Sequence, residues 1–200
     1  MRTQRLITYA SIVCLVVLSA GSAMAFGERD NPNALLKGKY RFSQNNTCAI
    51  VLGPDGFTDQ LVTLGDGFPA WLYLTGVATY DGVGNVTVKD HGIFIGGAGP
   101  SPFSQGNQPV STFADNCSGT YEVNPRDRSF TQKSSCTATD GSSYKLTGIK
   151  FEGQMSPDSS VLILSSAEPD VQTLNVPAAN GVAAKRICGA HVTSVRMRQE

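Results

Sequence analysis

One stretch, 116–136, constrains the fold of this chain more than any other, because it places two cysteines on either side of a turn-rich segment. If the turn is centred on residues 125–128, Cys117 faces Cys136. Facing Cα atoms of an antiparallel pair lie about 4.5–5.5 Å apart, within the range that a disulfide spans. The spacing therefore predicts a β-hairpin with a Cys117–Cys136 disulfide across it.

The two faces of this hairpin differ in polarity, which supports the register. The face that carries the cysteines is largely apolar, and the opposite face is polar. A slip of one residue would turn the apolar set toward water, so the pairing is well specified. The apolar face consists of Cys117, Gly119, Tyr121, Val123, Phe130, Gln132, Ser134 and Cys136.

The N-terminal residues 1–25 have the pattern of an export signal. Arg2 and Arg5 are followed by a short apolar run, and Ala23–Ala25 reads as a cleavage motif. The apolar run is too short to span a bilayer. We expect cleavage after Ala25, which leaves a single domain, 26–200, in the periplasm or outside the cell. The alternative interpretation is a buried helix.

Four cysteines remain in that domain. An even number of cysteines in an exported chain indicates a disulfide framework. If Cys117 pairs with Cys136, elimination pairs Cys48 with Cys188, which lie in the first and last expected strands. Such a bond would join the two ends of the sheet. The alternative is a set of reduced, buried cysteines.

Short apolar runs separated by turn residues predict an all-β chain. Strands are expected at 39–52, 70–80, 86–95, 119–124, 129–136, 143–155, 160–167 and 187–198, with long loops at 53–69, 96–115 and 168–185. Most of these strands join their sequence neighbours, in an up-and-down order. We therefore expect an antiparallel barrel of about eight strands, and a two-sheet β-sandwich is the alternative.

The composition argues against several classes of partner. Without the leader, the 16 acidic residues exceed the basic ones by about two, so the chain lacks the positive charge that nucleic acids and anionic membranes attract. No later segment is apolar enough to span a membrane. The chain has two histidines and no CxxC or HxxxH spacing, which argues against a zinc site. We expect neither a metal nor a cofactor.

No motif identifies an enzyme. Asp90 and His91 are adjacent, so a strand directs them to opposite faces. Neither a nucleophile elbow nor a phosphate loop occurs. The pattern favours a non-catalytic role, and a barrel isomerase or cyclase would need His91, His191 or a carboxylate in a pocket. Three aspartates of the first long loop lack the spacing of a calcium loop: Asp55, Asp59 and Asp66.

Two short motifs resemble those of known exported barrels. The opening Gly38–Phe42, GKYRF, is similar to the Gly-x-Trp opening of lipocalins, with Tyr40 in the tryptophan position. Arg196 and Arg198 stand where lipocalins carry an arginine over that aromatic ring. The stretch Thr79–Thr87, TYDGVGNVT, resembles turns of small secreted bacterial proteins of unknown function. The resemblance implies a calycin-like barrel and no defined activity.

The segment Ala70–Tyr80 carries the best candidates for ligand contacts. Both of its faces are apolar over the first half, which indicates a covered strand or a face that lines a cavity. Trp71, Tyr73 and Tyr40 are the candidate ligand-binding residues, since such side chains often anchor binding. We expect an exported barrel that binds a small apolar ligand. The alternative is a cell-surface or extracellular structural protein that contacts a surface partner.

Overall fold

The computed structural model describes residues 31–96, 110–141, 143–166, 168–176 and 182–198. The chain divides into two units, Met1–Pro32 and Asn33–Glu200. The expected leader and its cleavage site lie outside the described residues. All the strands belong to the second unit, and the short 3₁₀ turn η1 (Pro32–Leu35) precedes the first of them.

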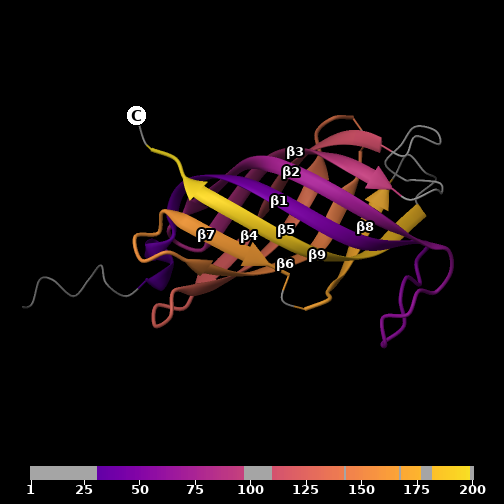
Figure 1. Cartoon of the computed structure of the whole chain (residues 1–200), viewed down its shortest axis with the longest axis horizontal. Coiled ribbons are helices and arrows are strands. Elements are labelled where there is room, and N and C mark those ends of the chain that lie inside the picture. The colour runs from indigo at the N-terminus through magenta and orange to yellow at the C-terminus, as the bar shows by residue number, and fades with distance from the viewer. Residues whose placement is uncertain (1–30, 97–109, 142, 167, 177–181, 199–200) are drawn as a thin grey trace, which may run out of the picture. The chain divides into compact units, whose positions relative to one another are not determined.

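The second unit is an antiparallel β-barrel. Strands β1 to β7 pair in chain order, and β1 also pairs with β9, so the sheet closes on itself (Figure 1). The predicted all-β barrel is confirmed, and closure leaves no open edge between its first and last strands. The strands are β1 (Lys37–Leu52), β2 (Gly67–Asp81), β3 (Asn85–Gly96), β4 (Val110–Val123), β5 (Ser129–Ala138), β6 (Lys145–Met155), β7 (Val161–Ser165), β8 (Val171–Val176) and β9 (Val182–Arg196).

Two short strands share one position in the barrel wall. Both β7 and β8 pair with β6 on one side and with β9 on the other. They are successive parts of one interrupted strand, so the barrel has eight strand positions and one extra strand. The expectation of one long loop at 168–185 is therefore wrong, because β8 and the start of β9 lie within it. The six residues of β8, VQTLNV, do not alternate between apolar and polar, so their pattern alone cannot distinguish a strand from a loop.

Alternate residues of each strand point into the barrel, as the two-residue period of a strand requires. The burial pattern of β1 alternates along most of its length. The largest side chains that are fully buried come from several strands and from the residue before β1. They are Tyr40, Phe94, Leu36, Ile50, Leu162 and Leu174.

Glycines at inward positions let neighbouring strands approach closely. A Cβ atom at Gly119 would lie 1.9 Å from the carbonyl oxygen of Lys133, and one at Gly76 would lie 2.3 Å from that of Lys89. No side chain fits at either place. Glycines of this kind mark sharp bends in a sheet, and a barrel of this size needs such bends to close.

Both predicted disulfides are present. Cys117–Cys136 joins β4 to β5 in the predicted register, with Val123 opposite Phe130. Cys48–Cys188 joins β1 to β9, at the pairing that closes the barrel. Each bond links residues that face each other directly across two strands, with Cα atoms 4.0 Å and 4.1 Å apart.

Candidate functional site

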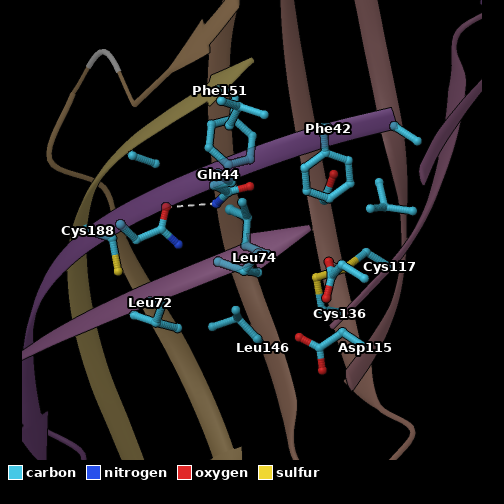
Figure 2. A pocket seen from close by; sticks show the side chains of 18 of the residues that line it. Phe42, Gln44, Leu72, Leu74, Asp115, Cys117, Cys136, Leu146, Phe151 and Cys188 are labelled. Atoms are coloured by element: carbon cyan, nitrogen blue, oxygen red, sulfur yellow. Dashed lines mark hydrogen bonds between the residues drawn. A yellow bond between two sulfur atoms is a disulfide. The ribbon is translucent and has the colours of Figure 1, made fainter. Parts of the chain in front are cut away.

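The inward side chains leave a cavity inside the barrel. Figure 2 shows side chains that line this cavity. The volume open to the centres of water molecules is about 80 Å³, several times what one buried water needs. Its walls are mostly apolar and include polar side chains from several strands. Such a mixture is typical of small-molecule sites. The apolar part includes Phe42, Leu72, Leu74, Phe113, Leu146 and Phe151.

One end of the barrel is filled by aromatic side chains. Tyr80 packs edge-to-face against both Tyr40 and Tyr121, with ring centroids 5.6 Å and 5.1 Å apart. The Tyr121 hydroxyl donates to the Leu36 carbonyl oxygen at 2.7 Å and accepts from the Gly82 amide at 2.9 Å. The chain before β1 thus covers this end. We call Tyr40, Tyr80, Tyr121 and Leu36 the closed end.

The polar part of the cavity wall contains an arginine and carboxylates. Arg186, 7 % exposed, donates from Nε to Gln172 Oε1 at 2.7 Å. Within the described part of the chain it makes no other hydrogen bond, and no carboxylate oxygen lies within 4.0 Å of it. Asp115, 5 % exposed, accepts a short hydrogen bond from the Tyr144 hydroxyl. We call Asp90, Asp115, Arg186 and Gln172 the polar layer.

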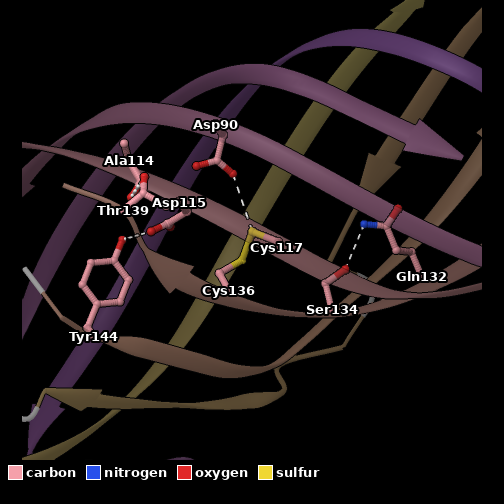
Figure 3. The surroundings of a disulfide bond; sticks show 9 residues. All are labelled: Asp90, Ala114, Asp115, Cys117, Gln132, Ser134, Cys136, Thr139 and Tyr144. Atoms are coloured by element: carbon pink, nitrogen blue, oxygen red, sulfur yellow. Dashed lines mark hydrogen bonds between the residues drawn. A yellow bond between two sulfur atoms is a disulfide. The ribbon is translucent and has the colours of Figure 1, made fainter. Parts of the chain in front are cut away.

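Asp90 lies beside Asp115 and beside a disulfide (Figure 3). Its Oδ1 atom is buried and has no hydrogen-bond partner. Its Oδ2 atom is 3.8 Å from Cys117 Sγ, but a disulfide sulfur has no proton to donate. Asp90 therefore receives no hydrogen bond from any residue that the structure describes.

Burial governs the protonation of this layer. It raises the pKa of Asp90 to about 7, and the neighbouring charge of Asp115 raises that pKa as well. Burial also raises the pKa of Asp115, against the hydrogen bond from Tyr144 and the charge of Arg186, which lower it. The pKa of Arg186 falls to about 10, again chiefly through burial. Asp90 is thus an interior group that changes charge near neutral pH.

Several other polar side chains of the interior form hydrogen bonds with one another. The Tyr80 hydroxyl donates to Gln132 Oε1 at 2.7 Å, and Gln132 Nε2 donates to Ser134 Oγ at 3.1 Å. Gln44 Nε2 donates to Asn46 Oδ1 at 2.8 Å. Each of these side chains has a hydrogen-bond partner in the protein, in contrast to Asp90.

The three aromatic candidates from the sequence do not line this cavity. Trp71 and Tyr73 lie on the outer face of β2, 39 % and 50 % exposed, because the strand turns Leu72 and Leu74 inward instead. Tyr40 is fully buried in the closed end and donates to the Ser159 carbonyl oxygen. A ligand contact at the outer pair stays a prediction.

The histidines also lie outside the barrel. His91 and His191 are exposed, so the titratable groups that line the cavity are two carboxylates, two tyrosines and an arginine. The loop aspartates Asp55, Asp59 and Asp66 stand outside the cavity lining. In the ranges that the structure describes, no group of three or more metal-ligating side chains comes together.

Sequence reasoning missed the charged residues of the polar layer. Asp115 precedes Cys117 by two residues, and Arg186 precedes Cys188 by two. Residues two apart on a strand share a face, so an inward cysteine implies an inward neighbour. The expected bounds place Asp115 at the end of the loop 96–115 and leave Arg186 just before the strand 187–198, so neither residue was recognised as an inward strand position.

No protein-family model matches this chain, and neither the curated proteins nor the solved structures gave a match. The lipocalin-like resemblance therefore stays an expectation. Within the described residues, no helix has the length and apolar character needed to cross a membrane.

Proposed function

We propose that this protein binds a small, largely apolar molecule inside its barrel. The observation that supports this proposal is the cavity, which combines apolar walls with charged side chains. An interior of this kind is a poor choice for stability alone, since buried charges are often less favourable than apolar residues of similar size. An eight-strand barrel is also just wide enough to hold one small ligand.

We propose in addition that the protein acts after export, in the periplasm or outside the cell. Two disulfides suit an oxidising compartment. A leader cleaved after Ala25 would deliver the chain there. Intact mass measurement of the exported protein tests this, because the proposed cleavage predicts a mature chain that begins at Phe26. A mature chain that retains the leader would contradict it.

Native mass spectrometry tests the binding proposal. Protein purified gently from its export compartment should carry a reproducible excess mass that leaves on denaturation. Ala190→Phe should abolish it, because Ala190 lines the cavity and is 4 % exposed, so the larger ring fills the space. Ala114→Phe is the matched control, since Ala114 lies outside that lining, next to exposed His91. The same bound mass on Ala190→Phe would contradict the proposal.

A second candidate function rests on the outer face. Trp71, Tyr73 and Ile93 are all exposed, and Tyr73 faces Ile93 directly across β2 and β3. Exposed apolar side chains that lie together often mark a protein contact. A role at the cell surface predicts an oligomer or complex that Trp71→Ser with Tyr73→Ser disrupts in sedimentation experiments. An unchanged sedimentation profile would count against this role.

A further inference from the structure

The charges of the polar layer do not balance. Arg186 and Asp115 shift each other's pKa values, each favouring the charged form of the other. Asp90 has no such compensation, and the charge that acts on it is the like charge of Asp115. The positive charge of Arg186 balances the negative charge of Asp115. When Asp90 is ionised as well, its negative charge has no counter-charge among these groups.

The barrel wall also gives Asp90 no hydrogen-bond donor. On one side it faces Asp115, another carboxyl group, and on the other it faces Gly76, which has no side chain. Asp115 has the Tyr144 hydroxyl, and Arg186 has Gln172, but Asp90 has only a disulfide sulfur nearby. A buried acceptor without a donor is destabilising unless another molecule supplies one.

The surroundings of Asp90 suit a ligand that has a short apolar body. Phe42 faces Gly76 across β1 and β2, one strand away from Asp90. Leu74 and Phe113 both face Gly92, two residues along β3 on the same side of the strand. All three side chains line the cavity together with Asp90. A molecule that places a polar group on Asp90 would therefore extend along aromatic and aliphatic walls.

We propose that the ligand is an amine with a small apolar body, whose ammonium group binds Asp90 with Asp115 alongside. This inference rests on the proposed function. An ammonium group supplies both things that Asp90 lacks, a positive charge and hydrogen-bond donors. A metal ion is a poorer fit, because the described residues bring no third metal-ligating side chain to the pair. An acid would bring its negative charge beside two carboxylates. Its counter-charge would have to be Arg186, whose positive charge Asp115 already balances.

A series of three probes with one apolar body tests the inference. Hexylamine, 1-hexanol and hexanoate are titrated calorimetrically into the mature protein at about pH 8, where the ionised form of Asp90 prevails. Hexylamine should bind about tenfold more tightly than hexanol, since a charge-assisted hydrogen bond exceeds a neutral one by roughly that factor. Hexanoate should bind more weakly than either.

Two matched variants locate the effect. Asp90→Asn should lower the affinity for hexylamine about tenfold and leave that for hexanol unchanged. Asp66→Asn removes the same charge from an exposed loop residue outside the cavity and should change neither. Circular dichroism confirms that each variant is folded, and the three-probe series on the unaltered protein stands without them.

The outcomes separate this inference from the proposed function. If hexanol or hexanoate binds as tightly as hexylamine, the cavity is a binding site but the amine assignment is wrong. If hexylamine keeps its affinity in Asp90→Asn, the assignment to Asp90 is wrong. If none of the three probes binds, both the inference and the proposed function are contradicted.

Discussion

The closed end and the polar layer lie in the same barrel interior, yet they are held together differently. In the closed end, the hydroxyl groups of Tyr40, Tyr80 and Tyr121 all have hydrogen-bond partners, and the rings pack against one another. In the polar layer, Asp90 has no hydrogen-bond donor among the residues that the structure describes. The closed end has the features of a stabilising core, and the polar layer those of a site that gives up stability for another purpose.

The disulfides lie beside the second of these regions. Cys117 is two residues from Asp115 and contacts Asp90, and Cys188 is two residues from Arg186. Both bonds therefore join strands of the barrel wall beside the charged side chains of the interior. Packing secures one end of the barrel, and covalent bonds secure the strands around the charged groups.

Removal of the Cys48–Cys188 disulfide, which joins the first and last strands, should cause the largest loss in the free energy of unfolding. Cys48→Ser with Cys188→Ser opens a loop of 140 residues, and chain entropy gives a loss of about 5 kcal/mol in the free energy of unfolding. The matched pair Cys117→Ser with Cys136→Ser opens only 19 residues and should lose about 3 kcal/mol. Urea unfolding measures both. The reverse order would show that native packing, and not loop length, sets the contribution of each bond.

Truncation of a side chain in the closed end should cause the next largest loss in the free energy of unfolding. Tyr80→Ala removes a ring that contacts Tyr40, Tyr121 and Phe130, so the free energy of unfolding should fall by about 3–5 kcal/mol. Differential scanning calorimetry and urea unfolding measure the loss. A loss below about 1 kcal/mol would mean that this end rearranges easily and is no rigid core.

The polar layer should respond to pH in a defined direction. In the unfolded chain Asp90 loses its proton near pH 3.8, and in the folded protein near pH 7. Between these values the folded state binds more protons, so the contribution of Asp90 to stability declines as the pH rises through this window. The full decline is on the order of 4 kcal/mol at most. Asp115 shifts in the same direction and adds to the decline.

The Asp90→Asn variant isolates this contribution. It should be more stable than the unaltered protein at about pH 8, by a few kcal/mol or less, and the two stabilities should converge toward about pH 4. Urea unfolding across the pH range measures the difference. A variant that is less stable at the higher pH would show that the ionised Asp90 has a partner in the folded protein.

A smaller effect should separate hydrogen bonding from packing in the closed end. Tyr121→Phe keeps the ring but removes the hydroxyl that joins Leu36 and Gly82. The free energy of unfolding should fall by about 1–3 kcal/mol, because two buried backbone groups lose a partner. Tyr73→Phe on the outer face is the control and should change stability by less than about 0.5 kcal/mol.

Much of the wall could be predicted from the sequence because strand periodicity and turn chemistry act locally. The polarity of the two faces of 116–136 fixed one disulfide, and elimination assigned the other. Strand β8 was missed because its six residues carry too little pattern. In β2 both faces are apolar, so alternation could not decide whether Trp71 or Leu72 would point inward.

The sequence by itself determined the strand pairing of the central hairpins, the two disulfides and the barrel class. Each of these depends on the two-residue alternation of side chains along a strand. Each also depends on residues that are close in sequence or joined by cysteine pairing. Only the tertiary structure decided what the barrel holds. Asp90, Asp115 and Arg186 come from β3, β4 and β9, and their proximity depends on the closure of the sheet. Burial then alters their charges, and burial is a property of the closed barrel, which no local pattern specifies.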